Sequence, residues 1–532
     1  MSLGSAPPLR SAWRWIHRVA AFATVLPLFF AKHLPFLDLP EHLALVATLR
    51  HWWDPVWESQ RYFYFESLLR TQYWLYHVVG ALLAVPLGTA ERSVFVLTLL
   101  SGLAYPYSLR ALARSLDRDP RIGLLGGPFF WSQALMHGLL NFVASIPLAL
   151  WGVSLLLDQI RGPTRVRALG LSVIAVALFY LHLSLFVFFC VTGAGLFLVF
   201  ARDVWAPSAK QFAKTLALRA SWLLPAFCFA LLFVWQSPVT HPESSQGEHA
   251  GVVRFIPILQ KPRLLMVWMH DVWRTPWHIG LALVMWGIIF VLIGASVRMQ
   301  KPSRLTVAAF VPFVVSVSLY LLMPTQVGYA FILDLRLAPL VGLTTVLLLH
   351  ARHESLTRFA FAAIAVVAVG FGLNSAYQMH TFEARETAHF ELVLRNLPPA
   401  KRLLTLVFQR ESRVAEVGPF LHFGSYYRAR YGGIASLSFS EMPHWPLRYR
   451  PEEAPPKKKI ALWDWNPCLF RNSTDGLYYD FILTRGDVDP FAHHPPGPKW
   501  FAIGGARDWK LYAKSSESWP EDGPDVGPCV GR

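Results

Sequence analysis

The sequence predicts a polytopic α-helical membrane protein that carries a smaller α/β domain at its C-terminal end. Only 15% of the 532 residues are charged, whereas a soluble globular domain averages about 25%. Apolar runs of about 17–22 residues recur before position 376, and each can cross a hydrocarbon core roughly 30 Å thick. This composition excludes a wholly soluble chain, and four cysteines are too few for a disulfide scaffold.

The net charge of +16 belongs to the membrane part of the chain. Residues 1–375 hold 29 basic and 15 acidic residues, while residues 376–532 hold 20 basic and 18 acidic residues. A nucleic-acid-binding protein gathers its basic residues on one face or stripe. Here they lie in short clusters between apolar runs, so we expect the bilayer, and no nucleic acid, to be their partner.

About eleven apolar segments are predicted to cross the membrane. They lie near 13–31, 93–109, 122–138, 140–157, 168–182, 184–201, 220–236, 277–297, 305–323, 337–351 and 359–376. The stretch 168–201 supplies two of them only if the chain turns tightly around Tyr180–Ser184. The first segment lacks an A-x-A cleavage signal, so it is predicted to be an uncleaved anchor.

The basic clusters orient these spans. Arg10, Arg14 and Arg18 precede the first span, which predicts a cytoplasmic N-terminus in the inner (plasma) membrane. Residues 72–87 are also apolar, but a crossing there would move two arginine clusters to the outer side. The charge bias therefore favours an interfacial or re-entrant helix over 72–87.

Two units follow from this topology. Residues 1–376 form the membrane domain, with outer loops at 32–91 and 237–276, and residues 377–532 form an extracytoplasmic α/β domain. An apolar helix over 255–269 in the second loop is predicted to lie on the membrane surface. The predicted strands of the tail are 402–408, 460–465, 478–486, 500–505 and 509–515, with a helix over 412–429.

Two cysteines of the tail, Cys468 and Cys529, would face an oxidising compartment and could form a disulfide. Sequence alone cannot decide whether their Cα atoms come within reach. The other two, Cys190 and Cys228, lie inside apolar spans and are read as packing residues.

The first outer loop contains the densest group of residues capable of chemistry. His33, Asp38, Glu41 and His42 lie within ten residues, just past the first span. Asp38 precedes a helix that begins near Pro40, so it is either a helix cap or a catalytic carboxylate. The residues themselves leave both readings open.

Other polar residues lie at the outer ends of predicted spans. Gln133, His137 and Asn141 fall at the turn between the third and fourth spans, where they face either a cavity or the interface. Three tryptophans of the first loop could stack on a ligand, but such residues more often anchor at the interface: Trp52, Trp53 and Trp57. Tail histidines His422, His493 and His494 lack metal-ligand spacing and are predicted to be structural.

Several of these features together resemble the GT-C superfamily of membrane glycosyltransferases. The resemblance rests on the cytoplasmic start of span one, the acidic motif FLDLPEH and the helix at 72–87. It continues through the following segment TAERSVFVLTLLSGLAYPYSLRALARSLDRD and the C-terminal α/β domain. The acidic pair is spaced as Asp38-x-x-Glu41, whereas adjacent residues are commonest in the superfamily. This leaves open whether Glu41 shares the site.

The resemblance implies a polyprenyl-phosphate-linked sugar as donor and an unidentified acceptor in the cell envelope. It implies that Asp38 is the general base of an inverting transfer, with Glu41 assisting it or binding an optional divalent metal such as Mg or Mn. The leaving lipid phosphate needs a cation, for which Arg336 and His182 are the candidates. Substrate contacts are assigned to His42, His137 and Asn141.

Two other classes of function remain as alternatives. A transporter or flippase of a lipid-linked precursor would show ionisable or Gly/Pro-interrupted positions within spans, often in paired halves. In this sequence, the predicted spans have almost no charged residues near their middle. A transporter or flippase is therefore the second choice after a glycosyltransferase. A non-catalytic scaffold would tolerate substitution throughout the first loop.

Overall fold

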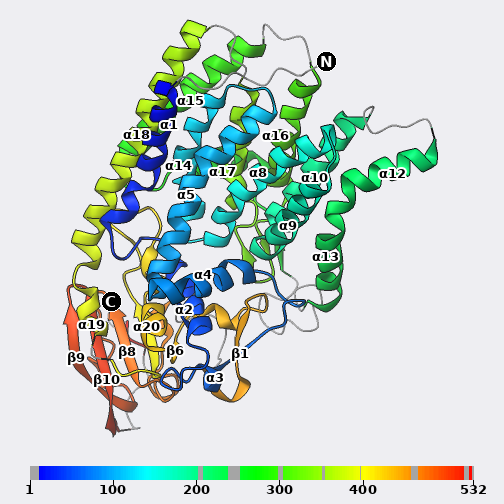
Figure 1. Ribbon diagram of the computed structural model, residues 1–532. Helices are drawn as coiled ribbons and strands as arrows, with labels where there is room; N and C mark the ends of the chain where they lie inside the picture. Colours follow the sequence, from blue (N-terminus) through cyan, green and yellow to red (C-terminus); the bar gives the residue numbers. More distant parts are fainter. Residues whose placement is uncertain are drawn as a thin grey trace.

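The computed structural model of the protein describes residues 11–201, 208–237, 252–297, 303–349, 354–395, 397–456, 465–520 and 527–529. Its helices stand side by side in a bundle, and most strands of the C-terminal part lie beneath one end of that bundle (Figure 1). The first outer loop lies between these two parts (Figure 1).

The bundle contains most of the predicted spans as helices. These are α1 (Ser11–Val25), α5 (Ala90–Ser115), α8 (Leu140–Arg161), α9 (Arg165–Leu181), α10 (Leu183–Val199), α13 (Leu224–Gln236), α15 (Pro276–Val297), α16 (Arg304–Leu322), α17 (Ala338–Thr345) and α18 (Glu354–Phe382). One further helix, α12 (Ala209–Ala220), matches no predicted span. Helix α9 ends and α10 begins on either side of His182, so the predicted tight turn within 168–201 is confirmed.

Among the described residues, five helices are long and apolar enough to cross a membrane. They are α5, α8, α16 and the segments Pro276–Gly294 and Ser355–Thr387. Other apolar helices, such as α10, are shorter than this requirement. The chain therefore has helices that suit a membrane protein, while the count of eleven membrane spans stays a prediction.

The predicted span 122–138 is not one helix. It consists of a 3₁₀ turn, η2 (Pro120–Leu125), and two short helices, α6 (Gly126–Phe130) and α7 (Gln133–Met136). Gly126 lies against the backbone of α5, where an added Cβ would stand 2.7 Å from the Pro106 nitrogen. Close packing between the two segments therefore requires a residue without a side chain at this position.

The segment 72–87 forms α4 (Trp74–Leu87), a helix of 14 residues. At 1.5 Å per residue it is about 21 Å long, shorter than the roughly 30 Å of a hydrocarbon core. It packs against α2 (Leu39–Arg50) and α5, and Figure 1 shows it lying across the lower end of the bundle. Both features fit the interfacial arrangement predicted from the charge bias.

The helix of the second outer loop is α14 (Lys261–His270). It packs against α7 and α17 and buries Trp268, while its position on the membrane surface stays a prediction. Nearby, β2 (Val253–Arg254), β3 (Gln326–Val327) and β4 (Ala330–Phe331) form a small antiparallel sheet.

The tail contains a mixed five-stranded sheet in the order β6-β5-β8-β10-β9. Its strands are β5 (Arg402–Val407), β6 (Ile434–Ala435), β8 (Phe481–Arg485), β9 (Gly497–Ala506) and β10 (Trp509–Trp519). β5 runs parallel to β6 and β8, and β10 runs antiparallel to β8 and β9. Four of the five predicted strands correspond to these, while 460–464 lies outside the described residues.

Short helices complete the tail. The predicted helix over 412–429 is much shorter than expected: a 3₁₀ turn, η9 (Pro419–His422), is followed by α20 (Ser425–Tyr431). Helix α19 (Phe390–Leu394) contacts β9 and β10.

The tail and the first outer loop are joined by strand pairing. β1 (Phe63–Phe65), which follows the short helix α3 (Ser59–Tyr62), pairs antiparallel with β7 (Leu447–Tyr449). One hydrophobic core contains residues of both the bundle and the tail, and α18 continues past position 376 to Phe382. The tail is therefore packed onto the membrane part and is not a separate module.

Cys468 and Cys529 form a disulfide with their Cα atoms 5.2 Å apart, which decides the question left open by the sequence. The bond joins positions separated by 61 residues. In the chain-entropy picture, closing a loop of this length stabilises the folded tail by at most about 4 kcal/mol.

Replacing both cysteines by serine is expected to lower the thermal unfolding temperature of the tail. The measurement is a thermal melt of detergent-purified protein, with dithiothreitol giving the wild type the same shift. Replacing Cys190, which lies in α10 outside the tail, should not reproduce it. An unchanged melt of the double variant would contradict a stabilising disulfide.

Candidate active site

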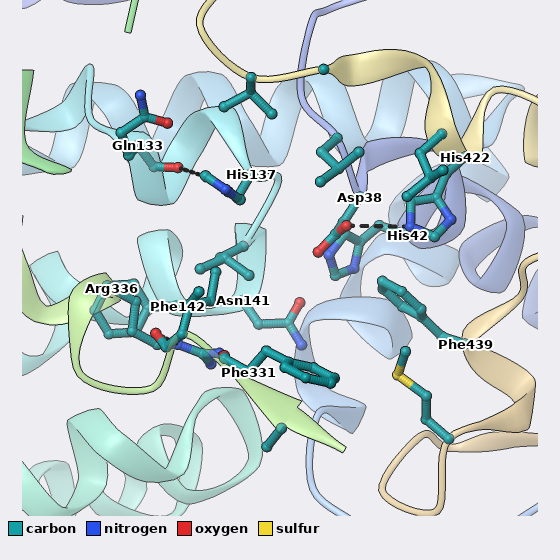
Figure 2. Close-up of a pocket in the computed structure, with 18 of the residues that line it drawn as sticks. Asp38, His42, Gln133, His137, Asn141, Phe142, Phe331, Arg336, His422 and Phe439 are labelled. Carbon is teal, nitrogen blue, oxygen red and sulfur yellow. Dashed lines mark hydrogen bonds and ion pairs between the residues drawn. The ribbon is translucent and has the colours of Figure 1, made fainter. Parts of the chain in front are cut away.

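A cavity of about 1040 Å³ opens where the bundle, the first outer loop and the tail meet. It brings together residues that are far apart in the sequence, as Figure 2 shows for ten of them. Seven polar residues singled out from the sequence line it: Asp38, His42, Gln133, His137, Asn141, His182 and Arg336.

Asp38 lies immediately before α2, and its side chain lines the cavity. It occupies the helix N-cap position, but its carboxylate makes no capping hydrogen bond. Its backbone N–H donates to the His137 carbonyl over 3.1 Å. Gly138 adopts φ +75°, and a Cβ there would stand 2.5 Å from the Asp38 nitrogen. A glycine is therefore needed for this close approach.

The surroundings of Asp38 favour its protonated form. Burial, reinforced by the negative charge of Glu41 and opposed by Arg336, raises the pKa of Asp38 to about 8. Among the described residues, its titratable neighbour at short range is His422, whose Nε2 lies 3.6 Å from Oδ1. A carboxyl with this pKa is able to take up and release a proton near neutral pH.

Arg336 provides a buried cation on another wall of the cavity. It lies in η6 (Leu335–Leu337) and is only 6% exposed. Its guanidinium donates to Nε2 of His182 over 2.9 Å and to the carbonyls of Ile332 and Phe331. Since arginine only donates, this Nε2 must be unprotonated, so His182 orients Arg336 and adds no charge.

Within the described part of the chain, Arg336 forms no ion pair with a carboxylate. The nearby Asp334 instead pairs with buried Lys261, Nζ to Oδ2 over 2.9 Å, and accepts from Thr325 and from the Leu335 backbone. Asp334 is thus paired with Lys261 and not with Arg336. A buried cation without a carboxylate suits an anionic ligand.

A second polar group lies on the side of α7 and α8. His137 donates from Nδ1 to the Gln133 carbonyl over 2.8 Å, and its ring stacks on Trp268 with centroids 4.7 Å apart. Asn141 is buried, and neither atom of its amide has a partner among the described residues. Buried amide groups are seldom left unpaired, so Asn141 is suited to binding a ligand hydroxyl.

His42 lines the cavity but is held by protein on both sides. Its Nε2 donates to the Gly138 carbonyl over 3.0 Å, and its Nδ1 lies 2.8 Å from Nε2 of His77. Burial keeps the pKa of His42 well below its usual value and lowers the pKa of His77 to about 4. His42 therefore fixes the loop of Gly138 against Asp38 and has little capacity for proton transfer.

Glu41 does not line the cavity, so the structure corrects the expectation that it shares the site with Asp38. Its side chain is fully buried and points into the tail. Four groups of the tail hold its carboxylate: the Ser425 hydroxyl, the Ser438 hydroxyl (3.1 Å), the Phe439 N–H (2.9 Å) and the Arg428 guanidinium (3.3 Å). Glu41 is therefore a link between α2 and the tail.

Replacing Glu41 by glutamine is expected to destabilise the protein by about 3–5 kcal/mol, because it leaves the buried Arg428 without its counter-charge. Thermal melts and limited proteolysis of the tail would measure the loss. Glu452→Gln, at an exposed position of the tail, is the matched control. Equal melting temperatures for Glu41→Gln and the wild type would contradict this role.

No protein-family model matches the chain, and no curated protein matches it. Solved structures do. ArnT from Cupriavidus metallidurans bound to undecaprenyl phosphate is similar over 96% of this chain and 99% of that one, with a TM-score of 0.59 and 12% identity. Apo ArnT covers 95% and 98%, with a TM-score of 0.52 and 12% identity.

The arabinofuranosyltransferase AftD from Mycobacteria has a TM-score of 0.52 and 16% identity over 96% of this chain, which spans 40% of AftD. The chain has the GT-C fold. The fold that the first-loop motif and the span pattern resembled is thereby confirmed.

Sequence reasoning missed several residues that line the cavity of this GT-C fold. The most consequential is His422, expected to be merely structural; Tyr73 and His444 and a set of aromatic side chains were also missed. No local motif marks them, because tertiary folding brings the tail to the first loop. The tryptophans Trp52, Trp53 and Trp57 are not among the lining residues.

The described residues do not provide a set of side chains arranged to bind the optional divalent metal. In the described ranges, no group of three or more His, Cys, Asp and Glu side chains is arranged to hold a metal ion. Glu41, the expected second carboxylate, is occupied by the tail. The residues present therefore do not fit a metal bridging Asp38 and Glu41.

Proposed function

We propose that this GT-C chain is a membrane glycosyltransferase. It transfers a sugar from a polyprenyl-phosphate carrier to a cell-envelope acceptor at the outer face of the inner membrane. The observation that carries the proposal is the presence, within one cavity, of a carboxyl with a raised pKa and a buried arginine that has no carboxylate partner among the described residues. ArnT, of the same fold, was solved with undecaprenyl phosphate bound.

In this mechanism Asp38 is the general base. The acceptor hydroxyl attacks the anomeric carbon of the donor and gives its proton to the Asp38 carboxylate. The bond between that carbon and the phosphate oxygen breaks, and its electron pair leaves with the lipid phosphate. A single displacement of this kind inverts the anomeric configuration.

Arg336 neutralises the charge that accumulates on the leaving phosphate, and His182 holds its guanidinium in place. Asn141 and His137 lie on the opposite side of Asp38 from the tail and are assigned to the sugar hydroxyls. Since the Cys468–Cys529 disulfide suits an oxidising compartment, it supports an extracytoplasmic tail and a cytoplasmic N-terminus.

The test is an assay of detergent-purified protein with a panel of radiolabelled polyprenyl-phosphate sugars and a membrane extract as the source of acceptor. Label should be retained by the protein and released as a product larger than the free sugar. Retention without product for every donor, together with donor movement across vesicles, would overturn the proposal in favour of a flippase.

A further inference from the structure

A histidine of the tail faces the proposed base. His422 is the last residue of η9, and its Nε2 lies 3.6 Å from Oδ1 of Asp38, as the dashed line in Figure 2 marks. The two residues are 384 positions apart, yet both line the same cavity. The tail thus contributes a titratable group at the centre of the site.

Hydrogen bonding fixes the orientation and tautomer of His422. Its Nδ1 lies 3.0 Å from the Leu437 carbonyl, which can only accept, so the neutral ring carries its proton on Nδ1. The ring packs edge-on against Phe439, with centroids 5.0 Å apart, and is 5% exposed. The unprotonated Nε2 is therefore held toward Asp38 and can exchange a proton with it.

The surrounding charges act on both members of the pair. Around Asp38 these are Glu41 and Arg336; around His422 they are Glu41, Arg428 and His42. Burial raises the pKa of Asp38 to about 8 and lowers the pKa of His422. Both shifts disfavour separate charges, so near neutral pH the proton of the pair rests on Asp38 and His422 is neutral.

We propose that His422 is the proton partner of Asp38 and that the tail domain is thereby part of the active site. This inference rests on the proposed function. His422 takes the proton of Asp38 on Nε2 and leaves Asp38 as a carboxylate, ready for the proton of the acceptor hydroxyl. After transfer the pair carries two protons, and it returns one to water. His422 acts through Asp38 and is a positioning residue.

The first test is the pH profile of kcat/KM for the wild type and His422→Gln. In the wild type, activity should fall as Asp38 becomes protonated below its pKa of about 8. Without a partner to take its proton, Asp38 should have a higher pKa in His422→Gln, so the fall in activity should begin at a higher pH than in the wild type. His493→Gln, an exposed tail histidine, is the control. An equal loss at every pH, or an unshifted profile, would overturn the proposal.

A second readout needs no sugar donor. A carbodiimide reacts with protonated carboxyls, and mass spectrometry can measure its addition to Asp38 as a function of pH. At pH 8, where about half of the wild-type Asp38 is ionised, His422→Gln, or His422→Asn if the first variant does not fold, should label more than the wild type. Equal labelling of both would contradict the pairing. A labelling shift in a protein that transfers no sugar would refute the proposed function and leave the pairing intact.

Discussion

Replacing Asp38 by asparagine is expected to reduce sugar transfer about 10²- to 10⁴-fold, the usual contribution of a positioned general base. Asparagine keeps the size of the side chain but cannot accept the proton of the acceptor hydroxyl. Donor binding should be unaffected, because the cation assigned to the phosphate is Arg336. Single-turnover assays with radiolabelled donor measure the first quantity, and equilibrium retention of label measures the second.

The matched control is Asp54→Asn, which neutralises another carboxylate of the same outer loop. Asp54 bonds to His51 and does not line the cavity. Its variant should transfer sugar at the rate of the wild type. Full activity of Asp38→Asn would remove Asp38 from the role of base and leave only the cavity and the fold.

Replacing Arg336 by glutamine is expected to weaken binding of the donor about 10- to 100-fold, since a hydrogen bond to a charged group contributes about 1.5–3 kcal/mol. The rate of transfer at saturating donor should also fall, because the phosphate becomes more negative as it leaves. Titration with an undecaprenyl phosphate lipid and single-turnover rates would measure both effects.

Arg254→Gln removes an exposed arginine of β2 and serves as the control. An Arg336→Gln variant that binds undecaprenyl phosphate as tightly as this control would contradict the phosphate site. Weak binding with an unchanged rate at saturation would limit Arg336 to ground-state binding.

The membrane part could be predicted from sequence because its signals are local. Apolar length located helices such as α5 and α8, and positive charge bias favoured an interfacial α4. The broken segment 122–138 has an equally apolar sequence. Its breaks follow from packing, where Gly126 meets the backbone of α5, and hydropathy carries no information about such contacts.

The site was predictable to the extent that its residues lie at span ends or in one motif. Asp38 and Arg336 were found in this way. The sequence left open whether Glu41 shares the site, because the motif does not reveal that groups of the tail bind its carboxylate. His422 was missed because no pattern in the tail reveals which loop it will meet.

The strand pairing of β1 with β7 also determines when the cavity can be completed. Phe63 and Tyr449 are partners in register but are separated by 386 positions, so they are not synthesised together. At roughly 5–20 residues per second, the ribosome delivers the second strand about 20–80 s after the first. During that interval the segment carrying Asp38 has been made, but the tail residues that line the cavity have not. The cavity therefore cannot form until the tail has been made and folded.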